Sequence, residues 1–218
     1  MSWDAMWDES FLEAIANTEE RTGTNPVDWR KGGRATKQNP DKEDKAWWDV
    51  NGKKMFFDFI NAWSESGFDV WITPENVPGV ELDLACTFDD VLVKGYADLV
   101  AVRGGELCVI DLKTGMYTPE SALQLGVYAC AMEKLFGVRP SKGYYYSARN
   151  AQFIEADGLD RWTIPVLTNL FNKFVIAVDN EIFLPNIGMN CKTCGVAEYC
   201  YAVGGQLSQI FDPLSQIK

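Results

Sequence analysis

Two consecutive glycines between two strand-like segments constrain the fold more than any other feature of this sequence. Residues 91–102 and 106–112 are rich in valine, leucine and isoleucine, and Gly104-Gly105 lies between them. Because glycine readily adopts the positive φ angles of a two-residue β-hairpin turn, we expect these segments to be antiparallel neighbours. The same turn fixes their register, since it pairs Arg103 with Glu106 and each further residue with the next one outward.

In this register two carboxylates lie opposite each other. Asp98 pairs with Asp111 at the end of an otherwise apolar face, and Tyr96 pairs with Lys113. Directly opposed side chains have Cβ atoms about 4.5–5.5 Å apart, where like charges repel. A bound divalent cation would compensate the two charges, and so in part would Lys113, which shares a face with Asp111. Alternatively, both carboxylates are solvent-exposed strand ends and Lys113 is their surface partner.

Apolar residues recur at helical spacing before and after the hairpin, and other short segments have the pattern of strands. We expect helices over about residues 8–21, 52–66, 119–136 and 161–181, and further strands over 80–87, 142–148 and 152–155. This order predicts an α/β fold with a mixed central sheet flanked by helices. We also expect three regions, namely an N-terminal helix and loop arm in residues 1–50, a core in 51–184, and a C-terminal cysteine cluster and tail in 185–218.

Composition excludes several kinds of chemistry. The chain contains no histidine, the residue that Ser-His-Asp and Cys-His catalysis, histidine-ligated zinc and HExxH proteases all require. The formal net charge of −11, from 31 acidic and 20 basic residues, argues against a broad basic surface and tight non-specific binding to phosphate backbones. It remains compatible with a local basic groove, or with a metal-filled acidic site that meets nucleic acid.

The sequence favours a cytoplasmic protein. No apolar run approaches the roughly 20 residues needed to cross a bilayer. Residues 1–8 are acidic and aromatic, whereas a secretory signal begins with basic residues followed by an apolar run.

The cysteines fall into two groups. Cys86, Cys108 and Cys130 stand alone in apolar segments and are expected to be reduced thiols of the core. Three others are closely spaced near the C-terminus, which predicts a shared metal centre, either iron–sulfur or zinc; the alternative is a set of ordinary packed thiols. These three are Cys191, Cys194 and Cys200.

Gln124 and Tyr128 are four residues apart on the helix expected after Lys113, so they share one helical face. That helix can lie across the sheet end that carries the carboxylates. Taken alone, such a glutamine is usually a surface residue and such a tyrosine a core residue.

Three motifs together resemble the RecB-type PD-(D/E)xK nucleases. The segments Gly95-Tyr96-Ala97-Asp98, Asp111-Leu112-Lys113-Thr114 and Gln124-Leu125-Gly126-Val127-Tyr128 are similar to Gly-x-x-Asp, Asp-x-Lys-Thr and Gln-x-x-x-Tyr of that family. The cysteine triplet is similar to that of the iron–sulfur members, which include the CRISPR-associated exonucleases and phage-encoded relatives. The resemblance covers about residues 50–201.

The resemblance implies a restriction-endonuclease-like core and a metal-dependent deoxyribonuclease. Asp98, Asp111 and the carbonyl of Leu112 would hold Mg²⁺ or Mn²⁺. Lys113 would orient the attacking water or stabilise negative charge. The expected activity is exonucleolytic, on DNA ends or single strands, in recombination, repair or phage DNA processing. The expected setting is a bacterial or phage-infected cell, with a protein partner or homo-oligomer as further options.

The resemblance also implies that Gln124 and Tyr128 position the metal site or the DNA strand. Aromatic side chains, among them Trp47, Trp48 and Tyr145, would either stack on the bases of a single strand or belong to the core.

Two departures from the family pattern concern ligands. The family usually carries histidine in a Gly-x-x-x-His setting, where this chain has Gly52 to Phe56. Either another ligand completes the metal site, with Glu81 as the candidate, or metal binding is weaker. The iron–sulfur members, which hold a 4Fe-4S cluster, take a fourth cysteine from the N-terminal region. Residues 1–85 contain none, and Cys86 is the nearest.

Two other functions stay open. One is a catalytically impaired nuclease-fold protein that binds DNA or a partner protein. The other is a metal-cluster structural protein in which Asp98 and Asp111 are incidental.

Overall fold

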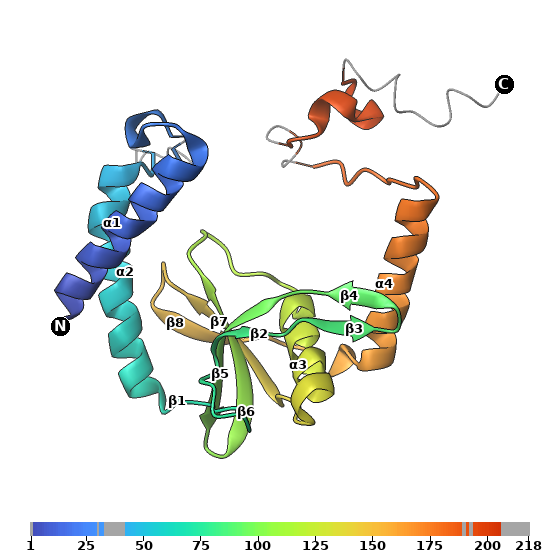
Figure 1. Cartoon of the computed structure of the whole chain (residues 1–218), viewed down its shortest axis with the longest axis horizontal. Helices are drawn as coiled ribbons and strands as arrows, with labels where there is room; N and C mark the ends of the chain where they lie inside the picture. Colours follow the sequence, from blue (N-terminus) through green and yellow to red (C-terminus); the bar gives the residue numbers. More distant parts are fainter. Residues whose placement is uncertain (1, 30, 33–41, 189–190, 192–193, 206–218) are drawn as a thin grey trace. The chain divides into compact units, whose positions relative to one another are not determined.

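The computed structural model describes residues 2–29, 31–32, 42–188, 191 and 194–205 (Figure 1). The helices are α1 (Trp3–Thr22), α2 (Lys45–Ser66), α3 (Leu123–Phe136) and α4 (Ile164–Asp179), with 3₁₀ turns η1 (Pro26–Asp28), η2 (Leu159–Arg161), η4 (Ala197–Tyr199) and η5 (Tyr201–Val203). The strands are β1 (Asp69–Val70), β2 (Val80–Asp83), β3 (Cys86–Phe88), β4 (Val91–Val93), β5 (Tyr96–Arg103), β6 (Glu106–Lys113), β7 (Lys142–Ser147) and β8 (Gln152–Glu155).

The chain divides into two compact units. The first comprises residues 1–87 and 92–164, and the second comprises residues 88–91 and 165–218. Every motif residue of the candidate nuclease site falls in the first unit, and the three clustered cysteines fall in the second. The region boundaries at residues 50 and 184 stay a prediction.

A six-stranded mixed sheet forms the centre of the first unit, as expected. Its order is β1-β5-β6-β7-β8, with β2 also paired to β5. β5 and β6 are antiparallel, and β6 and β7 are parallel. The predicted hairpin register is confirmed from Arg103↔Glu106 to Leu99↔Ile110, and both turn glycines have positive φ, 60° and 85°.

Each face of the sheet is covered by one helix, and Figure 1 shows α2 and α3 on opposite sides. Buried residues of one face, including Ile110 and Tyr146, form a core with side chains of α2, and the rings of Phe59 and Tyr146 are 5.0 Å apart. On the other face Leu125 of α3 packs onto Gly143, where a Cβ atom would lie 3.0 Å from the Leu125 side chain. Side chains on the α3 side are therefore the ones that face the candidate site.

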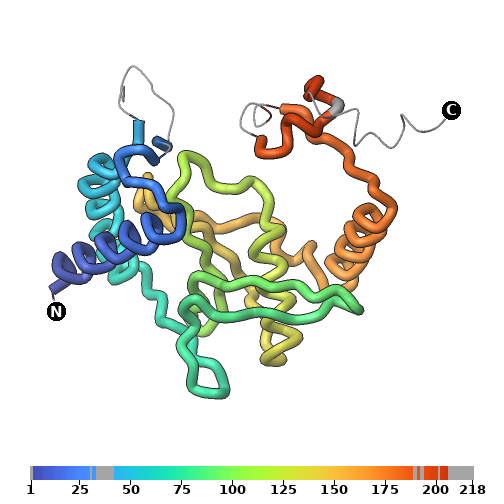
Figure 2. The backbone as a smooth tube through the Cα atoms, turned by 45° about the horizontal axis from the view of Figure 1, so that its top comes forward, coloured from blue at the N-terminus to red at the C-terminus, as the bar shows by residue number. Residues whose placement is uncertain are grey.

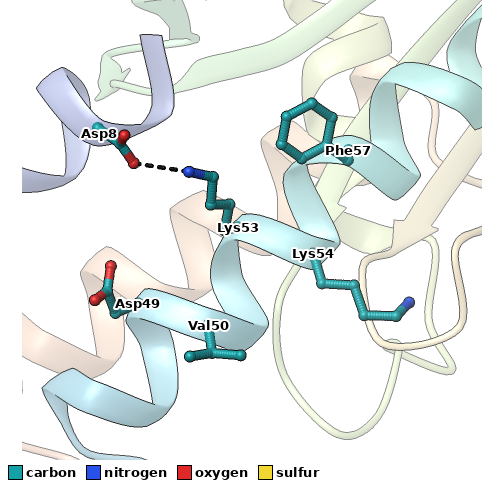
Figure 3. Close-up of a pocket in the computed structure, with 6 residues that line it drawn as sticks. All are labelled: Asp8, Asp49, Val50, Lys53, Lys54 and Phe57. Carbon is teal, nitrogen blue, oxygen red and sulfur yellow. Dashed lines mark hydrogen bonds and ion pairs between the residues drawn. The ribbon is translucent and has the colours of Figure 1, made fainter. Parts of the chain in front are cut away.

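α1 and α2 form an antiparallel helical pair. Trp7 of α1 lies over Gly52, the buried residue of α2, and Lys53 forms ion pairs with Asp4 and Asp8 at 3.1 and 2.9 Å. An open hollow of about 550 Å³ lies beside these contacts (Figure 3). No residue predicted for catalysis or metal binding lines it. It is lined by Asp8, Asp49, Val50, Lys53, Lys54 and Phe57.

Both N-terminal helices begin earlier than predicted, because polar caps precede them. The Ser2 hydroxyl accepts a hydrogen bond from the Ala5 amide at 3.3 Å, so α1 begins at Trp3. The Asp44 carboxylate accepts one from the Trp47 amide at 3.0 Å, so α2 begins seven residues before the expected Gly52. That backbone hydrogen bond also lowers the pKa of Asp44.

Side-chain hydrogen bonds also shorten other predicted elements. The predicted helix from Pro119 begins only at Leu123, because the Ser121 carbonyl accepts a hydrogen bond from the Tyr145 hydroxyl at 2.8 Å. The Asp83 carboxylate accepts a hydrogen bond from the Ala85 amide at 2.9 Å and ends β2 in a turn. The predicted strand 80–87 is therefore two strands. The predicted strand 91–102 is also two strands, because Lys94 and Gly95 separate β4 from β5.

None of the helices in the described part of the chain is long and apolar enough to cross a membrane.

Candidate active site

The candidate site lies where β5 and β6 separate. Their ladder ends at Leu99↔Ile110, and Asp98 and Asp111 are the next residues on the two strands. Beyond this point the Leu112 amide donates a hydrogen bond to Asp98 Oδ2 at 2.6 Å. The Asp98 carboxylate is thus hydrogen-bonded to the backbone of β6 at the residue after Asp111.

Asp111 is buried, with 2% of its surface exposed. Its Oδ2 atom forms an ion pair with Lys113 Nζ at 2.5 Å. Burial raises the pKa of Asp111, and the Asp98 carboxylate raises it further, whereas Lys113 lowers it. An ionised Asp111 would therefore be stabilised by an additional cation.

A chain of hydrogen bonds connects the sheet to α3. Lys113 Nζ donates to Gln124 Oε1 at 2.9 Å, and Gln124 Nε2 donates to the Tyr128 hydroxyl at 2.8 Å. Burial raises the pKa of Tyr128, and the nearby carboxylates of Asp111, Asp98 and Glu81 raise it further, against the Gln124 hydrogen bond. The structure thus brings together the side chains of all three sequence motifs.

Gly95 explains why the first motif begins with glycine. A Cβ atom at this position would lie 3.3 Å from the Tyr128 ring. The absence of a side chain lets the ring of the third motif pack against the strand of the first.

Glu81 lies on β2, which pairs with β5 along the edge of β5 that faces away from β6. Because Val80 pairs with Leu99 and Leu82 with Ala97, Glu81 falls at the position opposite Asp98. Its φ angle is 47°, a left-handed conformation that is uncommon for glutamate. Glu81, Asp98 and Asp111 therefore follow one another across three strands.

The donor set suits a hard divalent cation. Within the described residues, no three histidine, cysteine, aspartate or glutamate side chains are already arranged to hold a metal ion. The two motif carboxylates and the Leu112 carbonyl nevertheless provide oxygen ligands of the kind that Mg²⁺ and Mn²⁺ prefer. The burial of Asp111 and the second carboxylate beside it, which both raise the pKa of Asp111, are the observations that fit such an ion.

The position of the family histidine is used for packing in this chain. The ring of Phe56 lies 6.2 Å from that of Trp3 and 5.7 Å from that of Trp7, both on α1. Phe56 therefore contributes to the α1–α2 contact.

The structure tests the prediction for the core cysteines more fully than the prediction for the clustered ones. Cys86, Cys108 and Cys130 are buried, as expected of core thiols. In the clustered group, the Gly188 amide donates to Cys191 Sγ at 3.3 Å, and Cys194 is exposed. Among the described residues these thiols are not arranged around a common metal position, so their shared centre stays a prediction.

Sequence reasoning did not identify Glu43 and Arg149. Both Arg149 terminal nitrogens contact the Glu43 carboxylate, at 2.8 and 2.9 Å, although the residues are 106 positions apart. No local pattern could have revealed this pair.

The aromatic side chains considered for base stacking have other contacts. Tyr145 is 2% exposed, so base stacking is excluded for it. Trp47 and Trp48 are half-buried beneath the Arg149 guanidinium, with ring centres 4.8 and 5.5 Å from Cζ.

The fold and the site together define a class of protein. In the mixed sheet, β5 and β6 separate at two carboxylates, and a lysine lies beside the second of them. The family model of the PD-(D/E)XK nuclease superfamily matches residues 9–201. The chain belongs to this superfamily.

Two curated phage proteins are similar to it. The Gene 69 protein of Mycobacterium phage D29 is 34% identical over 146 residues, which cover 64% of this chain and 54% of the phage protein. The Gene 69 protein of Mycobacterium phage L5 is 32% identical over 129 residues, covering 57% of this chain and 43% of the phage protein. The chain thus spans about half the length of these relatives.

Proposed function

We propose that this protein is a metal-dependent deoxyribonuclease that removes nucleotides from DNA ends or single strands. The observation that carries the proposal is the convergence of Asp98, Asp111 and Lys113 where β5 and β6 separate, with Gln124 and Tyr128 hydrogen-bonded behind the lysine. Superfamily membership supports a nuclease. The phage relatives make phage DNA processing or recombination the proposed context.

Asp98, Asp111 and the Leu112 carbonyl would hold Mg²⁺ or Mn²⁺. When bound, the ion would supply a Lewis acid that polarises the scissile phosphate and lowers the pKa of a water molecule. The Leu112 amide fixes one Asp98 oxygen and leaves the other available as a ligand.

Lys113 would provide the positive charge that faces the phosphate. Its amine already lies between the Asp111 carboxylate and the Gln124 side-chain oxygen. From there it can orient the water that attacks phosphorus, or donate a hydrogen bond to the charge that develops on the phosphate oxygens. The bond from phosphorus to the leaving sugar oxygen then breaks; the water gives up a proton to solvent, and the leaving oxygen takes one from solvent.

The proposal is tested with end-labelled linear single strands, linear duplexes and closed single-stranded circles, each with Mg²⁺, Mn²⁺ or chelator. We expect metal-dependent digestion of the linear DNA and intact circles. Cleavage of circles, which have no ends, would show that the protein is an endonuclease and not an exonuclease.

Phe56, in the place of the family histidine, favours one alternative. A catalytically impaired nuclease-fold protein would bind DNA or a partner protein without cutting. It is the conclusion to draw if no DNA substrate is cleaved with either metal while binding is still measurable.

Glu81 is the proposed additional metal ligand, and we expect Glu81→Asn to raise the Mn²⁺ concentration for half-maximal activity about tenfold, equivalent to ~1.4 kcal/mol. Asparagine tolerates the left-handed backbone at this position, so the substitution removes the charge without added strain. Asp83→Asn is the matched control on the same strand, because its side-chain oxygen can still accept the Ala85 hydrogen bond. Equal Mn²⁺ requirements in both variants would show that Glu81 is not a metal ligand.

We also propose that the three clustered cysteines bind one metal centre, an iron–sulfur cluster in preference to zinc. Three closely spaced thiolates suit either metal, and Cys191 already accepts a backbone hydrogen bond from Gly188. Anaerobically purified protein should be brown, absorb light at about 400 nm and contain iron. Absence of both metals, with all three thiols alkylated in the native protein, would identify ordinary cysteines.

A further inference from the structure

Arg149, just after β7, uses its whole guanidinium group in contacts with distant parts of the chain. Its Nε donates to the Thr114 carbonyl at 2.8 Å, and its two terminal nitrogens contact the two oxygens of Glu43 at 2.8 and 2.9 Å. The Arg149 side chain is 15% exposed and that of Glu43 is 9% exposed. This is a two-point ion pair of the strong kind, because the planar donors match the carboxylate geometry.

The first turn of α2 encloses this ion pair. The Arg149 guanidinium lies over the rings of Trp47 and Trp48, an arrangement stabilised by cation–π attraction. Glu43 is itself fixed through its backbone, which exchanges two hydrogen bonds with Gly32 at 2.9 and 3.1 Å. In Figure 2 the turn that connects β7 to β8 lies beside α2, and Arg149 of this turn contacts Glu43 just before α2.

The contacts reach the backbone of Lys113. The Ala148 amide donates to the Lys113 carbonyl at 2.9 Å, and the next residue, Arg149, donates to the carbonyl of Thr114. Two consecutive carbonyls at the end of β6 are therefore held by two consecutive residues after β7. Since the Lys113 amine is used on the α3 side, its position depends on this backbone being fixed.

We propose that Arg149 is a positioning residue of the nuclease site. Held by Glu43 and covered by the two tryptophans, it fixes the backbone of Lys113 and Thr114 and thereby places the Lys113 amine. The segment preceding α2 would accordingly contribute to turnover and not only to stability. This inference rests on the proposed nuclease function.

The test is Arg149→Lys, which keeps the charge but loses the two-point contact and the Nε donor. Arg139→Lys is the matched control, because the Arg139 guanidinium also contacts a carboxylate, Glu133 at 2.9 Å, and a carbonyl, Trp162 at 2.8 Å, outside the candidate site. Glu43→Gln is a second variant that weakens the same contact from the other side.

Steady-state cleavage of single-stranded DNA in Mn²⁺ is measured well below the melting temperature of each variant. We expect Arg149→Lys to lower kcat about tenfold with KM changed less than about twofold, since small displacements of a catalytic group reduce rate more than binding. Glu43→Gln should lower kcat in the same direction, and Arg139→Lys should leave it unchanged.

The outcomes separate the two proposals. If the unmodified protein cleaves DNA and Arg149→Lys loses thermal stability but keeps the kcat of Arg139→Lys, Arg149 has a structural role and the inference is wrong. If the unmodified protein does not cleave DNA under any metal condition, the proposed function itself fails.

Discussion

Lys113→Ala should lower the rate of Mn²⁺-dependent DNA cleavage by roughly 10²–10³-fold while the protein stays folded. The Lys113 amine is the cation directly beside the Asp111 carboxylate, and its side chain is only partly buried. Its removal therefore eliminates a positive charge from the site without creating a cavity in the core. The measurement is single-turnover cleavage of a labelled single strand, with thermal melting of the same samples.

Lys142→Ala is the matched control for this loss. Lys142 is also a lysine at the end of a strand and in an ion pair, with Glu155 at 2.5 Å, but it lies at the opposite end of the sheet, beside Cys108. Its replacement should leave the cleavage rate unchanged. Full activity in Lys113→Ala would mean that another group carries the reaction.

Asp111→Asn separates chemistry from folding in the same assay. Because burial raises the pKa of Asp111, the folded protein holds its proton more tightly than the unfolded chain. Stability contributed by this group is therefore lost as the pH rises from the unfolded to the folded pKa, and the full penalty is present above the folded pKa. Without metal, Asp111→Asn should melt higher, by about 2–4 °C for each ~1 kcal/mol relieved, while its activity is lost.

Gly126→Ala should destabilise the first unit strongly, by about 3 kcal/mol, or a fall in melting temperature of roughly 6–12 °C. Gly126 lies in α3 against Trp162, and an added Cβ atom would lie 2.3 Å from the Trp162 Cβ and 2.5 Å from its Cγ. These atoms adjoin the backbone, so a side-chain rotation cannot relieve the overlap.

Gly52→Ala is the control for this substitution. Gly52 is also a buried glycine within a helix, but its added Cβ atom would meet the far end of the Trp7 ring at 2.7 Å, on the neighbouring helix. That ring can tilt, and alanine favours helix by about 1 kcal/mol over glycine. Gly52→Ala should therefore change stability far less. Similar melting temperatures for the two variants would contradict the tight packing of α3 against Trp162.

The parts of the fold that sequence could predict depend on local chemistry. The hairpin register follows from Gly104-Gly105, because a two-residue turn leaves the strands no other pairing. The start of α2 was missed because apolar periodicity outweighed the Asp44 cap, although an aspartate before a helical run is a recognisable signal. The division of strand 80–87 depends on one Asp83 side-chain hydrogen bond, which periodicity does not reveal.

The same distinction applies to the candidate site. Turn register relates Asp98, Asp111 and Lys113, and helical spacing places Gln124 and Tyr128 on one face. The two groups could be proposed as one site because together they resemble the motif series of the PD-(D/E)xK nucleases. Arg149 could not, because its contact with Glu43 arises only when β7 and the segment before α2 meet in the folded unit. Long-range ion pairs of this kind leave no periodic signal in a single sequence.

We propose that one divalent cation binds between Asp98 and Asp111 and is required for cleavage. The most direct test is the anomalous scattering of Mn²⁺ in crystals of the protein, at an Mn²⁺ concentration that supports cleavage in solution. We expect one strong peak with oxygen distances of about 2.1 Å to both carboxylates, absent from Asp111→Asn crystals. An active protein whose only Mn²⁺ peaks lie away from these two residues would contradict it.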